Sequence, residues 1–138
     1  MTPEQVTMVK DTWAQVAPIS EQAAELFYGR LFELNPDYQS LFTGDMKSQG
    51  KMLMSMLNTA VTSLDKLDAI VPAVQALGKR HVDYGVKPED YDTVGAALLW
   101  TLDKGLGDAF TDEVKEAWTE TYTTLATVMI EASKEVAA

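Results

Sequence analysis

The 138-residue sequence predicts an all-α fold. Apolar residues recur at spacings of three and four along almost the whole chain, which is the period of helices with one buried face. Residues that start and stop helices separate these stretches, and no segment alternates apolar and polar residues as a half-buried strand does. A chain of this length fits one domain, residues 1–138, that buries about two-thirds of its unfolded surface.

The first two predicted helices are separated by Pro18. Thr2-Pro3-Glu4-Gln5 resembles a capping box with proline at the first helical position, and this helix is expected to run to about Ala17. Ser20 is expected to cap the second helix, and Asn35-Pro36 to end it. The predicted buried faces are Val6, Val9, Trp13 and Val16, followed by Ala23, Leu26, Phe27, Leu31 and Leu34.

Four more helices follow a short connector at residues 37–43. The third helix is expected to start at Asp45, and the fourth near Asp68 with Pro72 in its first turn. Pro88 is expected to open the fifth, and Thr111 to cap the last. The predicted buried stripes are Met52, Leu53, Met56, Ala60 and Leu64; Ile70, Val74, Leu77 and His81; Tyr91, Val94, Leu98 and Leu102; and Val114, Trp118, Thr121, Leu125 and Val128.

The composition limits the cellular compartments and the classes of partner that are expected for this protein. The net charge is −10, with 21 acidic and 11 basic residues, which argues against nucleic acid or an anionic membrane as a partner. Such a surface serves solubility, or favours a basic redox partner. The sequence has no cysteine, no signal-peptide pattern at its start and no apolar stretch long enough to span a bilayer, so a soluble, cytoplasmic protein is expected.

The only histidine, His81, continues the apolar face of the fourth predicted helix. It could be a core residue with one satisfied hydrogen bond, or it could bind a haem iron through a neutral ring nitrogen. In the second case a backbone carbonyl one turn earlier, at Leu77 or Gly78, would orient the other ring nitrogen. Spacing alone leaves both interpretations open.

Other candidate residues are equally ambiguous. Tyr28 and Gln49 are polar residues that interrupt apolar faces, and each has an ordinary structural explanation beside a role at a ligand site. Phe42 is compatible with core packing. Thioether ligation of iron and cavity filling are both open for the methionines Met46, Met52, Met54 and Met56.

Six segments, by their order and spacing, carry a resemblance to a known family. They are residues 26–32, 41–42, 77–81, 84–86, 91–95 and 117–122. With them the whole chain resembles a globin of the single-domain bacterial haemoglobin type, similar to the haem domain of flavohaemoglobins and more distantly to neuroglobin. The resemblance implies a three-over-three helical sandwich that holds haem b.

The resemblance also implies roles for individual residues. His81 would be the proximal iron ligand, Phe42 would stack on the porphyrin, Tyr28 and Gln49 would form the distal polar pair, and Leu53 would pack over the iron. The full set expected to bind the cofactor is Tyr28, Phe42, Gln49, Leu53, Leu77, Arg80, His81, Val86, Tyr91, Val94 and Leu98.

Two positions near this set have alternatives. Lys79 and Arg80 either pair with the haem propionates or face solvent. The connector after Phe42 is short, so a register shift of one residue would place Ser48 or Gly50 where Gln49 is expected.

The chain departs from the family on the proximal side. In flavohaemoglobins a tyrosine at the place of Tyr91 joins a glutamate of the last helix to bond the proximal histidine. The alignment puts Ser133 at that glutamate, and Glu131 and Glu135, each two residues away, fall on a different helical face. This departure calls into question the electron donation that supports peroxidase-like and nitric-oxide dioxygenase chemistry.

Three functions are compatible with the sequence. The favoured one is reversible, high-affinity binding of dioxygen for storage, scavenging or delivery, with NO and CO as related ligands; it requires only the haem pocket and no enzyme activity. The alternative is a nitric-oxide dioxygenase served by a separate reductase, because the sequence holds no Gly-x-Gly-x-x-Gly nucleotide-binding element. The third is a helical module without haem, in which His81 is structural.

Overall fold

Helices make up nearly all of the described chain, which confirms the all-α prediction. The structure is a computed structural model that describes residues 2–42, 44–83, 86–87 and 89–137, and no strand occurs within these ranges. The elements are α1 (Pro3–Val16), η1 (Ala17–Ile19), α2 (Ser20–Leu34), η2 (Pro36–Leu41), α3 (Met46–Thr62), η3 (Leu64–Lys66), α4 (Leu67–Asp83), α5 (Asp90–Leu106), η4 (Gly107–Ala109) and α6 (Asp112–Ala137). None of the helices in those ranges has both the length and the apolar character needed to cross a bilayer.

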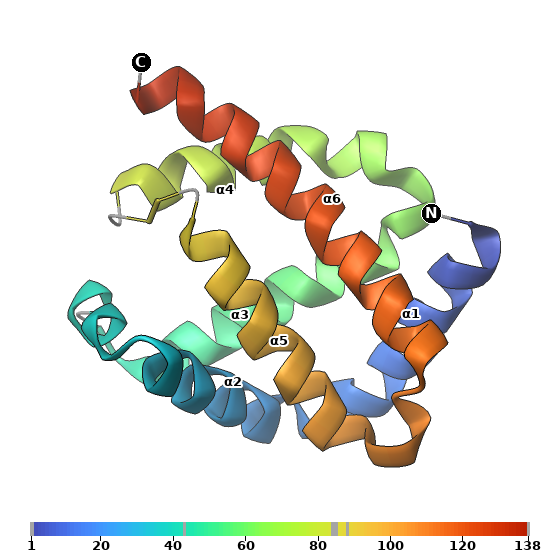
Figure 1. The fold of residues 1–138 in the computed structure, drawn as a ribbon. Helices are drawn as coiled ribbons and strands as arrows, with labels where there is room; N and C mark the ends of the chain where they lie inside the picture. The colour runs from blue at the N-terminus through green and yellow to red at the C-terminus, as the bar shows by residue number, and fades with distance from the viewer. Residues whose placement is uncertain (1, 43, 84–85, 88, 138) are drawn as a thin grey trace.

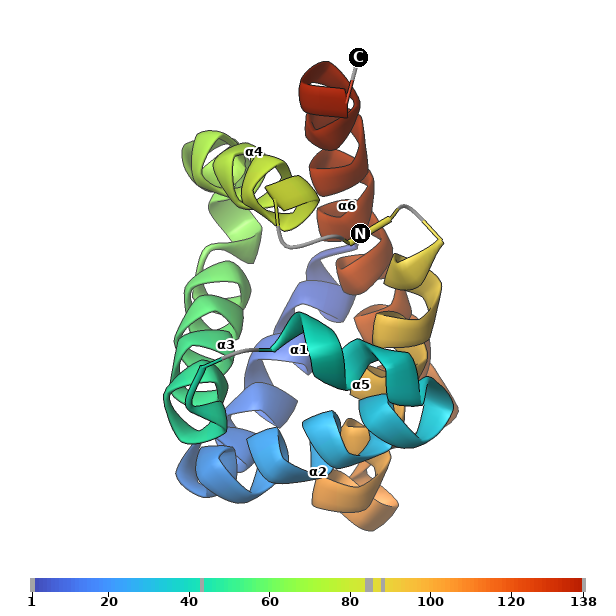
Figure 2. The same ribbon diagram turned by 90° about the vertical axis from the view of Figure 1, so that its left-hand side faces the viewer.

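The helices cross one another in two groups. Figure 1 shows α5 and α6 toward the viewer, and Figure 2, turned by 90°, shows α3 and α4 on one side with α5 and α6 on the other. Helix α2 runs across the lower end of the molecule in Figure 2, and it packs against both α3 and α5. Helix α6 packs most extensively against α4 and also contacts α1 and α5. The long C-terminal helix therefore supports the helix that carries His81.

Local sequence explains most of the helix boundaries. The capping box at Thr2 and Gln5 is confirmed, with the two reciprocal hydrogen bonds at 3.0 and 3.1 Å. Asp45 caps α3 through the Lys47 amide, and the Thr111 hydroxyl accepts from the Val114 amide.

The fourth helix starts beside Asp68 as expected, but two details of the predicted helix starts are wrong. Ser20 does not cap α2, because η1 continues directly into that helix and places Ser20 inside it with αR dihedral angles. Pro72 lies in the second turn of α4, since the helix begins at Leu67. The expected opening of α5 at Pro88 falls outside the described residues, and α5 begins at Asp90.

Two of the predicted buried faces are only partly correct. Met52 and Met56 of α3 are exposed, at 60% and 38%, while Met54 is buried at 7%. Leu26 and Leu34 of α2 are exposed as well, and their buried neighbours are Ala24 and Tyr28. Each helix touches more than one neighbour, so its buried surface spans adjacent faces that a single stripe does not describe.

Two tryptophans tie the N-terminal helix to the rest of the core. The rings of Trp13 and Trp118 lie 6.1 Å apart between centroids, and Trp118 is 1% exposed. The Trp118 indole N–H donates to the Thr12 hydroxyl at 2.9 Å, and the Trp13 indole N–H donates to Asn58 Oδ1 at 2.9 Å. Because both buried N–H groups are satisfied, the pair joins α1 to α6 and α3 without a desolvation penalty.

Small residues set the closest helix approaches. A methyl group added to Gly78 of α4 would collide with the backbone of Met129 on α6, and one added to Gly50 of α3 would lie 2.9 Å from the Ala24 Cβ of α2. Glycine at these positions lets the helix backbones approach closely. The α4–α6 contact lies one turn before His81.

We expect Gly78→Ala to lower the free energy of unfolding by about 1–3 kcal/mol, because the added methyl forces α4 away from α6. Gly29→Ala is the matched control, since Gly29 lies in α2 with no heavy atom within 4 Å of an added Cβ. That control should raise stability by about 0.5–1 kcal/mol through helix propensity alone. Urea unfolding of both variants measures the difference; equal effects would contradict the close packing.

Candidate functional site

His81 is held in a defined orientation in the last turn of α4. Its Nδ1 lies 2.8 Å from the Leu77 carbonyl oxygen, which favours the tautomer that carries the proton on Nδ1 and the lone pair on Nε2. Burial lowers the pKa of the imidazole, the Arg80 charge lowers it further, and the Leu77 hydrogen bond opposes them. The Val86 backbone amide donates to the His81 carbonyl at 3.0 Å. A neutral imidazole is therefore favoured at neutral pH.

Tyr91 of α5 lies beside the imidazole. The two rings are stacked, with centroids 6.2 Å apart and an interplanar angle of 29°. Tyr91 is 6% exposed, and its buried hydroxyl has no hydrogen-bond partner among the residues that the structure describes. Burial accordingly raises the pKa of that hydroxyl.

Tyr122 of α6 positions Tyr91 through the backbone. Its hydroxyl donates to the Tyr91 carbonyl at 2.6 Å, and its ring occupies the space where Gly95 lacks a side chain. Burial, with smaller contributions from Tyr91 and Asp92, raises the pKa of the Tyr122 hydroxyl well above its ordinary value. Sequence reasoning did not identify this role. The available signal was Tyr122 four residues after Trp118, which continues the buried face of the last helix.

The second polar group consists of Tyr28 and Gln49. Tyr28 of α2 is 7% exposed, and burial raises the pKa of its hydroxyl. A side-chain hydrogen bond with Gln49 of α3 lowers that pKa, so it opposes the effect of burial. Gln49 itself is half-buried. Its backbone N–H donates to the Asp45 backbone carbonyl at the start of α3.

Aromatic rings enclose the Tyr28 side chain. Phe27 and Phe42 meet it edge to face, with centroid distances of 5.1 and 5.3 Å, and Phe32 lies 6.1 Å away. Phe42 and Phe32 also contact each other at 5.5 Å. This apolar wall limits the directions in which the Tyr28 hydroxyl can find a polar partner.

The remaining candidate residues occupy different environments. Leu98 belongs to the buried core at 6% exposure, and Leu53 and Val94 are partly buried against that core. Val86 is half-buried, and Arg80 is exposed.

The structure thus groups the candidate residues around two polar centres. His81 lies with Leu77, Val86 and Tyr91, and Tyr28 lies with Gln49 and Phe42.

These donor residues fit a porphyrin-bound iron better than a bare metal ion. No group of three or more His, Cys, Asp or Glu side chains in the described ranges could hold a metal. A single neutral imidazole, oriented by a carbonyl one turn earlier, is the protein ligand that haem iron takes when the porphyrin supplies the other nitrogens. Buried Tyr28 and half-buried Gln49 supply hydrogen-bonding groups of the kind that a distal haem pocket uses.

The described residues near Ser133 place no carboxylate beside Tyr91. Ser133 is buried, and its hydroxyl donates to the Ile130 carbonyl at 2.7 Å. Glu131 is exposed and pairs with Lys134 at 3.2 Å. The side chain of Glu135 lies outside the described residues. The unpartnered Tyr91 hydroxyl agrees with this arrangement.

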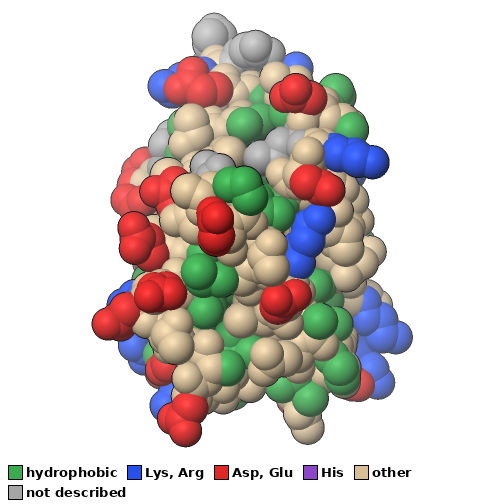
Figure 3. Space-filling view, turned by 90° about the vertical axis from the view of Figure 1, so that its right-hand side faces the viewer, with side chains coloured by type: hydrophobic (Ala, Val, Ile, Leu, Met, Phe, Trp, Pro, Cys, Tyr) green, Lys and Arg blue, Asp and Glu red, His purple; other side chains and the backbone are tan. Residues whose placement is uncertain are grey.

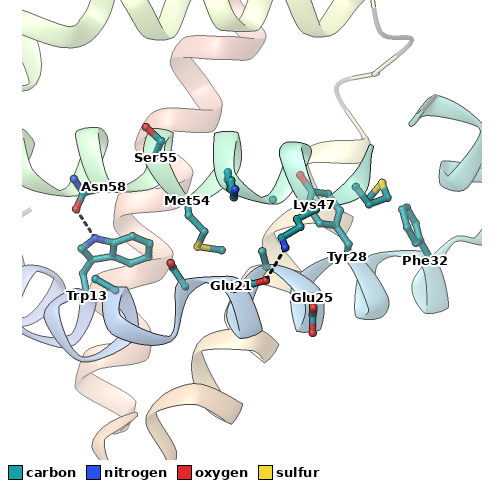
Figure 4. Close-up of a pocket in the computed structure, with 15 residues that line it drawn as sticks. Trp13, Glu21, Glu25, Tyr28, Phe32, Lys47, Met54, Ser55 and Asn58 are labelled. Carbon is teal, nitrogen blue, oxygen red and sulfur yellow. Dashed lines mark hydrogen bonds and ion pairs between the residues drawn. The ribbon is translucent and has the colours of Figure 1, made fainter. Parts of the chain in front are cut away.

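A separate groove of about 830 Å³ runs between α1, α2 and α3. In the close-up of Figure 4, the Trp13–Asn58 hydrogen bond lies at one end and Phe32 at the other, and Lys47 reaches across to Glu21 at 3.8 Å. Tyr28 lines this groove, whereas His81 does not. Its lining residues Trp13, Met54 and Asn58 were not expected to form a cavity, because they come from helices whose crossing is a property of the tertiary fold.

The Globin family model matches residues 25–129 of the chain. Flavohemoproteins are among its relatives: the protein of Halalkalibacterium halodurans is 33% identical over 99% of this chain and 34% of its own length. That of Rhodopirellula baltica is 34% identical over 91% of this chain and 31% of its own length. The chain thus spans about a third of the length of these relatives.

The fold matches a solved structure over its whole length. A bacterial globin from Campylobacter jejuni superposes with a TM-score of 0.86 and is 26% identical, with 98% of each chain covered. The globin fold expected from the sequence is therefore confirmed.

Paired Tyr→Phe variants test the geometry around His81. Tyr91→Phe removes a buried hydroxyl without a partner and keeps the ring, so we expect the free energy of unfolding to stay equal or rise by about 1 kcal/mol. Tyr122→Phe removes a hydrogen bond to the Tyr91 carbonyl and should lower the free energy of unfolding by about 0.5–1.5 kcal/mol. Urea unfolding distinguishes the two. A loss for Tyr91→Phe as large as that for Tyr122→Phe would mean that the Tyr91 hydroxyl has a partner.

Proposed function

Because the chain belongs to the globin family, we propose that it binds haem b through His81 and binds dioxygen reversibly and with high affinity. The observation that carries the proposal is the His81 imidazole, which is kept neutral by burial and oriented by the Leu77 carbonyl. Haem supplies, when bound, a ferrous iron that takes up dioxygen, NO or CO. The protein's contribution is to hold the cofactor and to set the polarity of the two faces.

On the proximal face, the Leu77 carbonyl holds the proton of His81 at Nδ1 and leaves the Nε2 lone pair available, so that Nε2 would be the atom that holds the iron. Tyr91 stacks beside the ring and restricts its rotation. The close approach of Gly78 to α6 holds this turn of α4 in place. Leu98, Val94 and Leu53 would contribute apolar contacts to the cofactor, and Arg80 a charge for a propionate group.

On the distal face, Tyr28 and Gln49 would act as one hydrogen-bonding unit. The aromatic rings of Phe27, Phe32 and Phe42 pack around the Tyr28 ring and hold it in place. The Tyr28 hydroxyl, kept protonated by its raised pKa, can donate to a bound gas molecule while Gln49 donates to the tyrosine oxygen. Donation in an apolar site slows release, which suits scavenging or storage better than bulk delivery.

Nitric-oxide dioxygenase activity with a separate reductase is the second candidate. The flavohemoprotein relatives favour it, since this chain is similar to part of those proteins. The unpartnered Tyr91 hydroxyl and the Ser133 hydroxyl turned to Ile130 weigh against the proximal electron donation that such chemistry uses. The rate of NO consumption in the presence of oxygen and a supplied reductant would separate the two functions.

Replacing the proposed iron ligand tests cofactor binding. We expect His81→Ala to lose stable haem incorporation, and exogenous imidazole to restore it, because no other histidine exists in the chain. The visible absorption spectrum of the purified protein with haem supplied, read at the Soret band, measures this. A full Soret band in the variant without imidazole would refute the ligand assignment.

Replacing the distal tyrosine tests ligand stabilisation. Tyr28→Phe should speed dioxygen release about tenfold, because one hydrogen bond in an apolar site is worth about 1–3 kcal/mol. Tyr38→Phe is the matched control, since it also removes a hydroxyl from a buried tyrosine, one that donates to Asp90 at 2.7 Å. Stopped-flow dissociation kinetics give both rates. An unchanged rate for Tyr28→Phe would reduce this residue to a packing role.

A further inference from the structure

Both carboxylate oxygens of Asp90 accept hydrogen bonds, and the two donors come from different segments of the chain. The Tyr38 hydroxyl donates to Oδ1 at 2.7 Å, and the Lys87 backbone N–H donates to Oδ2 at 2.9 Å. The Asp90 backbone N–H in turn donates to the Lys87 carbonyl at 2.9 Å. Asp90 is the first residue of α5 and is half-buried. One side chain therefore joins η2, which contains Tyr38, to a residue that precedes α5.

The Lys87 hydrogen bonds lead from Asp90 to His81. Lys87 directly follows Val86, whose backbone N–H donates to the His81 carbonyl at 3.0 Å. Val86 and Lys87 are therefore hydrogen-bonded on both sides, to His81 through Val86 and to Asp90 through Lys87. We call the group around the imidazole the His81 centre: His81, Leu77, Val86 and Tyr91.

The Tyr38 hydrogen bond leads from Asp90 to Tyr28. Tyr38 belongs to η2, which packs against α2, the helix that carries Tyr28. Phe42 directly follows η2, and its ring meets the Tyr28 ring edge to face with centroids 5.3 Å apart. We call this second group the Tyr28 centre: Tyr28, Gln49 and Phe42. The position of η2 therefore sets the position of a ring that packs against Tyr28.

Local helix formation explains only one of the two interactions of the carboxylate. A carboxylate at the start of a helix commonly accepts from a backbone N–H that is close in sequence, as Asp90 does from Lys87. Tyr38 lies 52 residues away, so the start of α5 does not require its hydrogen bond. Burial, together with the Asp90 hydrogen bond, raises the pKa of the Tyr38 hydroxyl. The hydroxyl is therefore protonated at neutral pH and donates to a charged acceptor, which makes a stronger hydrogen bond than a neutral one does.

We propose that Asp90 is a positioning residue that holds the His81 centre and the Tyr28 centre together and so slows the loss of the cofactor. The inference rests on the proposed function, in which haem is bound through His81 with Tyr28 on its other face. Release of a cofactor that contacts both centres requires the segments that carry them to separate. Asp90 acts through Tyr38 on one side and through Lys87 on the other.

Two substitutions at Asp90 remove different numbers of acceptors. Asp90→Ala removes both, whereas Asp90→Asn keeps one acceptor oxygen, which can serve Tyr38 or Lys87 but not both. The asparagine variant has nearly the same size as the native residue, so it tests the proposal even if the alanine variant does not fold. A graded effect, larger for alanine than for asparagine, is what a residue that bridges two donors should give.

Asp92→Ala and Asp92→Asn are the matched controls. Asp92 is an exposed acid in the same turn of α5, and its substitutions remove the same charge. Acidic side chains occur over much of the face drawn in Figure 3, among hydrophobic and basic ones. The loss of one exposed charge by itself should therefore change little.

Two NMR measurements on the full chain, made before haem is supplied, report whether the two centres are coupled. Hydrogen exchange of the Phe42 backbone N–H, which donates to the Gln39 carbonyl at 3.2 Å, reports the end of η2. The imidazole signals report the His81 centre, and they are unambiguous because the chain has one histidine. Circular dichroism first establishes that each variant keeps its helices.

We expect Asp90→Ala to speed exchange at Phe42 about tenfold and to shift the His81 ring signals, because a hydrogen bond to a charged group is lost on each side. Asp90→Asn should change both less, and the Asp92 variants should change neither. Faster exchange confined to Lys87 and Asp90, with Phe42 unaltered, would reduce Asp90 to a residue that only starts α5 and would overturn the proposal. Equal effects of the Asp92 variants would overturn it as well.

Transfer of haem to an excess of apomyoglobin then measures loss of the cofactor. We expect the transfer from Asp90→Ala to be about tenfold faster than from the unaltered protein, for the same lost hydrogen bonds. An unaltered transfer rate would overturn the role in cofactor retention. If the unaltered protein binds no haem, the proposed function fails, and the two NMR measurements still decide whether Asp90 joins the two centres.

Discussion

The contact between Gly78 and the backbone of Met129 is the constraint on which the site depends. It brings α4 against α6, the most extensive helix pairing in the molecule, and it lies one turn from His81. A side chain at position 78 would push this part of α4 away from α6, together with the neighbouring Leu77 carbonyl that orients the imidazole. The same helix α6 carries Tyr122, which holds the backbone of Tyr91 and fills the space beside Gly95. One long helix therefore positions both residues of the His81–Tyr91 pair.

The Tyr28–Gln49 pair is stabilised by a different set of interactions. Burial opposes ionisation of Tyr28, and the aromatic residues around it leave Gln49 as the polar group with which its side chain interacts. Gln49 reaches it because α3 starts at Asp45, whose side chain and carbonyl fix the first turn. Position 50, the residue after Gln49, lies so close to Ala24 of α2 that a Cβ there would be 2.9 Å from the Ala24 Cβ. A small residue at position 50 therefore allows α3 to approach α2, the helix that carries Tyr28.

Much of the fold could be predicted from the sequence, because capping residues and prolines act locally. The capping box at Thr2, the α3 start after Asp45 and the end of α2 at Asn35 all follow from neighbouring side chains. Burial on α2 and α3 could not be predicted as well. Met52 and Leu34 have the right spacing for a buried stripe, but which face is covered depends on crossing helices that are distant in sequence. The Tyr122–Tyr91 hydrogen bond spans 31 residues for the same reason, and no local pattern contains it.

The net charge is limited in a similar way as a predictor, because a sum over the chain does not say where the charges lie. A total of −10 is a correct sum, and it explains repulsion from polyanions at distances where the protein acts as a single charge. At contact distance the Debye length of about 8 Å limits the field at any one residue to the charges nearest to it. Beside His81 the charge that acts on the imidazole is that of Arg80, which lowers the pKa of the ring although the chain as a whole is acidic. The average charge therefore predicts what the molecule avoids in bulk, while the field at an individual side chain depends on the few charges beside it.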